Sequence, residues 1–217
     1  MISAIILAAG NSSRFGGDTP KQFLKINRKL LIDFSISEFK SIPSINKIII
    51  VTSKKYHKKM KNIYTDCIIT IGGKTRKESS YNGLIACPKN TKKVLIHDAA
   101  RVLIKKSLII KCIKKLDSFD AVTLGIPVKD TIAKFKNNSI TKIDDREKLI
   151  AIQTPQGFDY KKIKSAHETH SNNYTDDIRL MLETGYQCKL IKGDEKNFKI
   201  TDRLDFIKLK QILRDTK

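Results

Sequence analysis

The feature that most constrains this chain is a repeated alternation of short apolar runs with amphipathic segments. Near-continuous runs of Ile, Val and Leu occur at residues 2–7, 47–51, 67–71, 93–96, 121–126 and 188–191. Such runs are typical of strands buried on both faces of a sheet. Between them, apolar residues recur at helical spacing at 31–39, 78–87, 108–116 and 175–183. The alternation predicts an α/β fold with a mostly parallel sheet and helices on both faces.

One polar segment, residues 128–148, interrupts this alternation. Within it, Asn137 and Asn138 lie between two short stretches of alternating residues, which predicts a β-hairpin. A long polar hairpin either lies on the surface or reaches a partner chain. No linker rich in Pro, Gly or Ser divides the 217 residues. We therefore expect a single domain, 1–217, with a projecting β-hairpin arm at about 128–148.

The formal net charge of +21 admits a polyanionic partner, such as nucleic acid, an anionic membrane or phosphorylated small molecules. The lysines are scattered along the sequence, so a compositional bias explains the charge better than a dedicated binding surface does. The sequence contains no recognised nucleic-acid-binding motif and no apolar run long enough to span a bilayer. We expect neither a nucleic-acid partner nor membrane association, and a basic nucleic-acid-binding protein stays as the alternative of another class.

The cysteines point to a reducing compartment. Cys67, Cys87, Cys112 and Cys188 have neither the CxxC spacing of a redox motif nor that of a zinc site, and three of them lie within apolar runs. The apolar N-terminus lacks a basic segment and ends in a glycine turn, which indicates a first buried strand rather than a signal peptide. Together these features predict a cytoplasmic protein.

The segment after the first predicted strand has the composition of a phosphate-binding loop. Ala8, Ala9 and Gly10 are small enough to let backbone N–H groups approach phosphate oxygens. Arg14 and Lys21 would add a planar guanidinium group and a mobile ammonium group to the same site. The alternative is an exposed turn with unrelated cations, which the position directly after a buried strand disfavours.

A second glycine-containing segment, 72–75 (GGKT), is similar to the end of a P-loop. Ile68 stands where a P-loop needs glycine, so we exclude that type of ATPase. The glycine pair would let the backbone come close to a base or a ribose. Arg76 and Ser79 follow at the start of a predicted helix, near its positive dipole end.

Three acidic residues, Asp98, Asp176 and Asp177, follow a predicted strand or lie at a predicted helix. Asp98 comes just after the strand 93–96, where a carboxylate is well placed to hold a hard cation such as Mg²⁺. The alternative for Asp98 is an N-cap of a helix. Asp176 and Asp177 either cap a helix or support the metal region.

Three basic positions in the C-terminal third need an interpretation. Lys199 lies in a strand-like alternating stretch that could direct its side chain into a cleft. His167 and His170 belong to a HETH sequence, which lacks the HExxH spacing of metalloproteases. We interpret both histidines as exposed helix residues.

Read in order, these segments resemble the family of 2-C-methyl-D-erythritol 4-phosphate cytidylyltransferases, CTP-using enzymes of the non-mevalonate isoprenoid pathway. The resemblance is carried, essentially from end to end, by AAGNSSRFG, PKQF, GGKTRKESSYNGL, IHDAAR, PVKDT, AIQTPQGF, TDDI and NFKIT. It implies a Rossmann-like nucleotidyltransferase fold whose β-arm joins two subunits into a homodimer. It also implies transfer of CMP from CTP to a polyol phosphate with Mg²⁺ or another divalent cation.

The resemblance also implies roles for individual residues. It places Arg14, Lys21 and Lys199 around the reacting phosphate as catalytic residues, and Asp98 at the metal. The nucleotide-binding positions that it implies are Ala8, Ala9, Gly10, Gly73, Arg76, Ser79 and Asp98. The substrate-binding positions that it implies are Arg101, Thr131, Arg146 and Thr154, of which Thr131 and Arg146 lie in the arm and would act across the dimer.

The chain departs from the family pattern at a few positions. Ser12 stands where glycine is usual, Val102 stands where proline is usual, and 148–150 (KLI) replaces a segment that usually contains tryptophan. Parts of the sequence also resemble the first half of bifunctional enzymes that carry a cyclodiphosphate synthase domain. Because the sequence ends at Lys217, we expect no such second domain.

Two alternatives keep related chemistry. A cytidylyltransferase for another alditol phosphate, such as ribitol 5-phosphate, would share the first loop and the HDA segment, and the arm around Thr131 and Arg146 would distinguish the two. A molybdopterin-guanylyl or sugar-nucleotide pyrophosphorylase would share the first loop but neither AIQTPQGF nor the arm.

Overall fold

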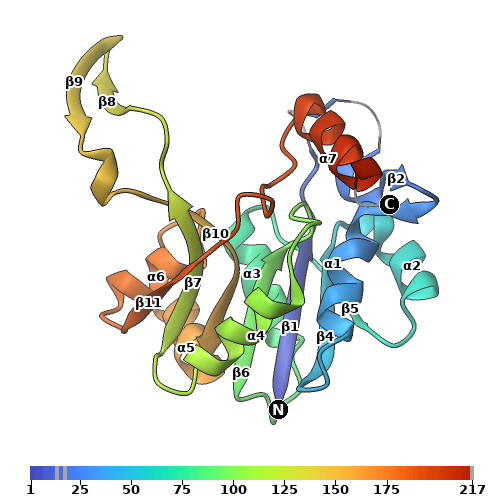
Figure 1. Cartoon of the computed structure of the whole chain (residues 1–217). Helices are drawn as coiled ribbons and strands as arrows, with labels where there is room; N and C mark the ends of the chain where they lie inside the picture. Colours follow the sequence, from blue (N-terminus) through green and yellow to red (C-terminus); the bar gives the residue numbers. More distant parts are fainter. Residues whose placement is uncertain (13–14, 17–18, 216–217) are drawn as a thin grey trace.

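The computed structural model describes residues 1–12, 15–16 and 19–215, and its centre is a seven-stranded sheet (Figure 1). The strand order is β11-β7-β10-β6-β1-β4-β5. The strands are β1 (Ile2–Ala8), β4 (Ile45–Thr52), β5 (Ile68–Ile71), β6 (Lys93–Asp98), β7 (Ala121–Pro127), β10 (Ile150–Asp159) and β11 (Cys188–Lys192). The antiparallel strand β10 pairs with β6 and β7, and the remaining pairs are parallel. The predicted mostly parallel sheet is confirmed, whereas β10 was not predicted.

Helices cover both faces of the sheet, as predicted. The helices α1 (Leu31–Lys40), α2 (Lys54–Ile63) and α4 (Lys106–Lys115) pack on one side, and α3 (Arg76–Ile85), α5 (Tyr160–Thr169) and α6 (Asp177–Glu183) pack on the other. Alternate residues of one strand enter opposite cores, so that Ile6 joins the first hydrophobic cluster and Ile5 joins the second. Burying a side chain of this size contributes about 1.5–3 kcal/mol. The strands are therefore fixed from both sides.

A third hydrophobic cluster lies beyond the carboxyl ends of the strands, under helix α7 (Arg203–Asp215) (Figure 1). Leu209 of this helix is fully buried there, and the ring of Phe206 meets that of Phe15 edge-on with the ring centroids 5.8 Å apart. Near it, the short strands β2 (Lys25–Ile26) and β3 (Lys29–Leu30) form a small hairpin after the 3-10 helix η1 (Lys21–Phe23). Packing of α7 thus braces the loop that follows β1.

The arm is the predicted hairpin. Strand β8 (Ile132–Lys136) pairs with β9 (Ser139–Asp144), and the turn residues Asn137 and Asn138 have φ values of 50° and 61°. Asparagine tolerates this left-handed conformation, which tight hairpin turns require. A short 3-10 helix, η2 (Arg146–Lys148), leads back to β10, and the hairpin projects away from the sheet (Figure 1).

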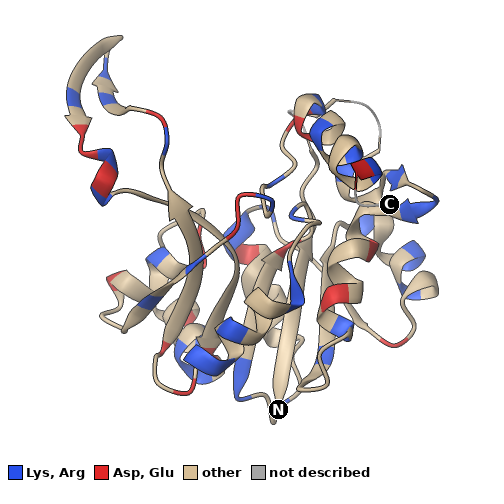
Figure 2. Ribbon diagram, in the orientation of Figure 1, with Lys and Arg blue, Asp and Glu red and all other residues tan. Residues whose placement is uncertain are grey.

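Positive charge is spread over helices on both sides of the sheet and over α7, rather than gathered in one stripe (Figure 2). Cys87 and Cys112 are buried, Cys67 and Cys188 are half-buried, and all four are free thiols. Within the described ranges, none of the helices combines the length and the apolar character that crossing a membrane requires.

Candidate active site

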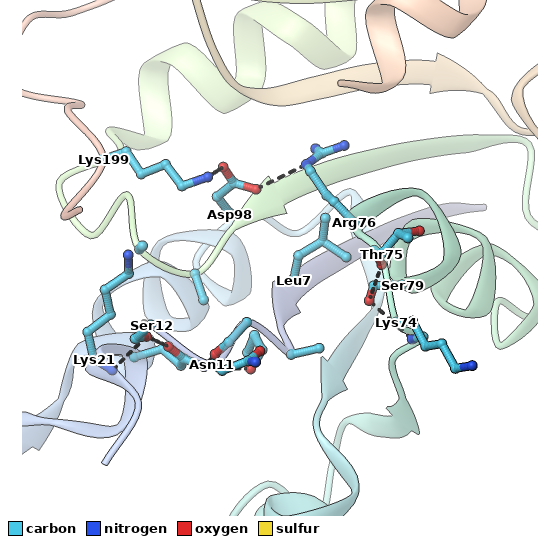
Figure 3. Close-up of a pocket in the computed structure, with 17 residues that line it drawn as sticks. Leu7, Asn11, Ser12, Lys21, Lys74, Thr75, Arg76, Ser79, Asp98 and Lys199 are labelled. Carbon is cyan, nitrogen blue, oxygen red and sulfur yellow. Dashed lines mark hydrogen bonds and ion pairs between the residues drawn. The ribbon is translucent and has the colours of Figure 1, made fainter. Parts of the chain in front are cut away.

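The candidate active site is a pocket between the carboxyl ends of β1 and β6. Successive crossovers run from β1 to β4 and β5 on one side, and the chain then returns to β6 on the other side of β1. Ligands of open α/β sheets bind at such a reversal of strand order. We call it the β1–β6 pocket, and its lining is Leu7, Ala8, Ala9, Gly10, Asn11, Ser12, Lys21, Gln22, Gly73, Lys74, Thr75, Arg76, Ser79, Asp98, Ala99, Ala100 and Lys199 (Figure 3).

The structure brings most of the predicted site residues together in this pocket. Every predicted nucleotide-binding residue lines it, and so do the predicted catalytic residues Lys21 and Lys199. Arg14 lies outside the described residues. Several lining residues were not predicted, among them Lys74, Thr75 and Gln22. A Thr-x-x-Glu capping pattern at 75–78 was the available signal for Thr75, whose hydroxyl accepts a hydrogen bond from the Glu78 N–H at 3.1 Å.

The two glycines before α3 are required by packing against protein atoms. A Cβ atom at Gly72 would lie 2.5 Å from the Cβ of Ala9, and one at Gly73 would lie 2.2 Å from the Cβ of Glu78. Any larger residue would therefore push the loop away from β1 and from α3. Close approach of this loop is what places Arg76, the first residue of α3, at the wall of the pocket.

Asp98 is the one carboxylate among the described lining residues, and two cations hold it (Figure 3). Its Oδ2 lies 2.7 Å from the Nζ of Lys199, and its Oδ1 lies 3.6 Å from the Nε of Arg76. Burial would raise the pKa of Asp98, but Arg76 and Lys199 hold that pKa well below its usual range. The carboxylate is therefore ionised at neutral pH. The alternative of Asp98 as a helix N-cap is wrong, because the next helix, α4, begins at Lys106.

Behind Arg76, a second buried carboxylate fixes the guanidinium group. The Nη1 of Arg76 lies 2.7 Å from the Oδ2 of Asp177, whose Oδ1 lies 3.1 Å from the Nε2 of His167. Burial would raise the pKa of Asp177, but Arg76 lowers it to about 2. The prediction that His167 is an exposed helix residue is wrong, because its side chain is fully buried against Asp177. His170 is half-buried and follows the end of α5 rather than lying within it.

Asp176 and Lys199 show what local sequence could and could not predict. Asp176 is the N-cap of α6, and its side chain accepts a hydrogen bond from the Ile178 N–H, so the capping alternative is confirmed. Lys199 does not lie in a strand, contrary to the prediction, but in an irregular segment before α7. Its direction is set by the Asp98 ion pair and by the neighbouring Ile200 N–H, which bonds to the Ala100 carbonyl.

The backbone N–H of Asp98 is held by Thr154, whose hydroxyl contacts the buried side chain of His97. The Asp98 N–H donates to the Thr154 hydroxyl at 3.0 Å, and that hydroxyl lies 3.1 Å from the Nδ1 of His97. The His97 Nε2 lies 3.1 Å from the Arg101 carbonyl. A consistent set of donors makes His97 a neutral ring that accepts at Nδ1 from Thr154 and donates from Nε2 to Arg101. Burial lowers the pKa of His97 to about 4.

This histidine predicts a pH dependence of stability. An unfolded chain protonates His97 near pH 6.5, whereas the folded protein keeps it neutral down to about pH 4. The unfolded state therefore binds more protons in this window, and the free energy of unfolding falls by on the order of 3 kcal/mol as the pH drops from 6.5 to 4. Urea unfolding of wild type and His97→Gln across this range should give a shallower pH slope for the variant, and equal slopes would contradict the assignment.

None of the four predicted substrate-binding residues is among the described residues that line the pocket. Thr154 is 3 % exposed and its hydroxyl is engaged by Asp98 and His97, so in this structure it positions Asp98. Arg101 donates to the carbonyls of Asn197 and Ile152 at 2.8 and 3.2 Å. Thr131 and Arg146 are exposed on the arm.

The donor set fits a cation that a nucleotide would bring with it. Across the part of the chain that the structure describes, no group of three or more His, Cys, Asp or Glu side chains is placed to hold a metal. Mg²⁺ is usually held by one or two carboxylates together with substrate phosphates, rather than by a complete protein cage. Asp98 is ionised and lines the pocket. It can supply the carboxylate of such a site.

Nearly the whole chain is similar to known proteins of one family. The sequence model of the family described as 2-C-methyl-D-erythritol 4-phosphate cytidylyltransferase matches residues 2–215. A Clostridium tetani protein of that name is 39 % identical over 214 residues, covering 94 % of this chain and 87 % of that protein. The "Bifunctional enzyme IspD/IspF" of Pelagibacter ubique is 39 % identical over 213 residues, covering 97 % of this chain. The chain spans 57 % of the length of that relative.

A solved structure shows the same architecture. The crystal structure of 4-diphosphocytidyl-2C-methyl-D-erythritol synthase from Anaerococcus prevotii is similar with a TM-score of 0.87 and 27 % sequence identity. The similarity covers 98 % of this chain and 96 % of that one. The predicted Rossmann-like nucleotidyltransferase fold is therefore confirmed.

Proposed function

The chain belongs to the 2-C-methyl-D-erythritol 4-phosphate cytidylyltransferase family. From this premise we propose that the β1–β6 pocket of this protein is the site of cytidylyl transfer to 2-C-methyl-D-erythritol 4-phosphate. CTP would bind there, its cytidylyl group would pass to 2-C-methyl-D-erythritol 4-phosphate, and pyrophosphate would leave. The reaction belongs to the non-mevalonate isoprenoid pathway. A cytoplasmic location remains a prediction from the cysteine content.

The observation that carries the proposal is the charge of the pocket. Four cationic side chains and one carboxylate are among its described lining residues: the cations are Lys21, Lys74, Arg76 and Lys199, and the carboxylate is Asp98. A pocket with this excess of positive charge, at the reversal of strand order, attracts a ligand with several phosphate groups. The small residues Ala8, Ala9 and Gly10 on its floor leave room for that ligand.

The chemistry asks for positioning and charge rather than for a general base. In the proposed reaction, a phosphate oxygen of the acceptor forms a bond to the α-phosphorus of CTP, and the bond from that phosphorus to the oxygen bridging the α- and β-phosphates breaks. The bridging oxygen leaves with pyrophosphate. Because the nucleophile is already an anion, the task is to hold two anions together and to stabilise the charge that develops on the α-phosphate.

Lys21 and Lys199 are placed to do this from one side of the pocket (Figure 3). The ammonium group of Lys199 has three donors, so it can keep Asp98 and still face a phosphate oxygen. Arg14 is predicted to join them. A divalent cation held beside Asp98 would neutralise part of the triphosphate charge and polarise its oxygens.

The nucleotide preference is tested by incubating the protein with Mg²⁺, 2-C-methyl-D-erythritol 4-phosphate and CTP, UTP, ATP or GTP in turn. Mass spectrometry should find 4-diphosphocytidyl-2-C-methyl-D-erythritol in the CTP reaction and no corresponding product with ATP. A product with ATP but none with CTP would overturn the proposed nucleotide.

We propose further that the arm completes the site of a second subunit. Its apolar side chains are unusually exposed, with Phe135 at 74 %, Ile140 at 70 % and Ile143 at 63 %. Phe135 and Ile140 are paired across the hairpin, and exposed apolar side chains that lie together are typical of an interface. In a homodimer joined by this surface, Thr131 and Arg146 would face the acceptor phosphate in the partner's pocket.

Subunit complementation tests this arrangement. Arg146→Ala and Lys21→Ala should each be nearly inactive alone. Co-expressed in equal amounts, they form mixed dimers as half of the population, and each mixed dimer has one intact site made from both chains. Such a mixture should recover about a quarter of the wild-type rate. Activity no higher than the average of the two single variants would mean that Arg146 serves its own subunit or neither.

A further inference from the structure

Gln22 is a buried polar side chain beneath the β1–β6 pocket that the chemistry above does not use. It is 4 % exposed, and its Nε2 donates to the carbonyls of Ala8 and Gly10, both at 2.8 Å. Because both neighbours of this nitrogen are acceptors, the orientation of the amide is fixed, and Oε1 faces the other way. The side chain therefore ties the segment that carries Lys21 to the end of β1.

Ser12 occupies the other end of this amide. Its hydroxyl donates to the Oε1 of Gln22 at 3.2 Å and accepts a hydrogen bond from the backbone N–H of Lys21 at 3.1 Å (Figure 3). Lys21 is the first residue of η1, and Pro20 at the N-cap makes no side-chain hydrogen bond to that helix. Ser12 thus supplies, from across the loop, an acceptor for the first N–H of this helix, which would otherwise lack an intrahelical partner.

The backbone conformation of Ser12 is one that favours glycine. Its φ is 61°, in the left-handed region, where residues other than glycine are uncommon. Glycine would adopt this conformation without strain but could make neither hydrogen bond. Ser12 therefore connects the Lys21 backbone to the Gln22 side chain from a position where the backbone conformation favours glycine.

We propose that Ser12 and Gln22 are positioning residues that form a latch for Lys21. The latch runs from the Lys21 N–H through the Ser12 hydroxyl to the Gln22 amide and on to the carbonyls of Ala8 and Gly10. It fixes the start of η1 against the end of β1, so the Lys21 ammonium group meets the α-phosphate without a search through loop conformations. The inference rests on the proposed function, because it gives Lys21 its task.

Ser12→Ala and Ser12→Gly test the latch better than variants of Gln22, which would leave the buried Ala8 carbonyl without this donor and could prevent folding. We expect both Ser12 variants to lower kcat for pyrophosphate release by about tenfold, with little change in KM for CTP. Glycine relieves the backbone strain and alanine does not, so their thermal stabilities should differ while their kcat values agree. Thr19→Ala, an exposed hydroxyl on the same loop, should match wild type.

A double-mutant cycle separates positioning from a general structural effect. In a Lys21→Ala background, Ser12→Ala should cause no further loss, because the group that it positions is gone. Amide hydrogen exchange at Lys21, followed by NMR, should be faster in Ser12→Ala than in wild type. An equal loss in both backgrounds, or a kcat that follows thermal stability, would overturn the latch.

The remaining outcomes also decide between the two proposals. An active wild type with an impaired Lys21→Ala and normal Ser12 variants would overturn the latch alone. A wild type without activity towards CTP and 2-C-methyl-D-erythritol 4-phosphate would overturn the proposed function, and the latch with it.

Discussion

Replacing Lys21 by alanine is expected to lower kcat by about 10²–10³-fold while the protein stays folded. Lys21 lies on the pocket wall near the position proposed for the α-phosphate, where negative charge grows as the acceptor oxygen attacks. A cation that acts on this developing charge stabilises the transition state more than it stabilises the bound CTP of the ground state. The loss should therefore appear mainly in kcat, with a smaller rise in KM for CTP.

The matched control is Lys25→Ala. Lys25 is an exposed residue of β2, four positions after Lys21 in the sequence. Its replacement by alanine removes the same charge at a position outside the pocket lining. Its steady-state constants should stay close to those of wild type, and circular dichroism should show that both variants are folded. A Lys21→Ala enzyme with nearly normal kcat would remove Lys21 from the chemistry.

Neutralising Asp98 is the second change with a large expected effect. In Asp98→Asn, Lys199 and Arg76 lose the carboxylate between them, and the pocket loses its candidate metal ligand. We expect kcat/KM to fall by about 10³-fold and the Mg²⁺ concentration for half-maximal rate to rise. The fold should survive, because the backbone N–H of residue 98 still donates to the Thr154 hydroxyl and Arg76 still forms its ion pair with Asp177.

Asp117→Asn is the control for charge alone. Asp117 is 69 % exposed and pairs with Lys93 on the surface, so its loss should leave both the rate and the Mg²⁺ dependence unchanged. If Asp98→Asn kept the wild-type Mg²⁺ dependence, the metal would not be held by this carboxylate. Comparison of the two variants therefore separates an effect on metal binding at Asp98 from the general effect of removing one negative charge.

The centre of the sheet could be predicted from sequence because strands such as β1 and β6 are buried on both faces. The runs at 2–7 and 93–96 correspond to β1 and β6, and the rule that ligands bind at the carboxyl ends of such strands located the pocket. Helix α2 was missed because its sequence is dominated by lysines and Met60 is its one buried residue, so few apolar side chains mark it as a packed helix. Strand β10 was missed because the segment 153–156 (QTPQ) interrupts its apolar run with polar residues and a proline, although the strand is buried there.

Contacts between distant parts of the sequence set the limit on predicting the site. Arg76 meets Asp177 across 101 positions, and His97 meets Thr154 across 57. No local pattern reports such pairs, so His167 was interpreted as exposed and Lys199 as part of a strand. The family resemblance located Lys21, Asp98 and Lys199, but their partners were visible only once the chain was folded.

The most direct test of the proposed reaction is pyrophosphate release by the purified protein with CTP and Mg²⁺, with 2-C-methyl-D-erythritol 4-phosphate and ribitol 5-phosphate supplied in separate reactions. Both acceptors present an alcohol phosphate to the same cations, so the comparison isolates the choice of substrate. We expect rapid release with 2-C-methyl-D-erythritol 4-phosphate and background release with ribitol 5-phosphate. Release with ribitol 5-phosphate alone, or with neither acceptor, would contradict the proposed function.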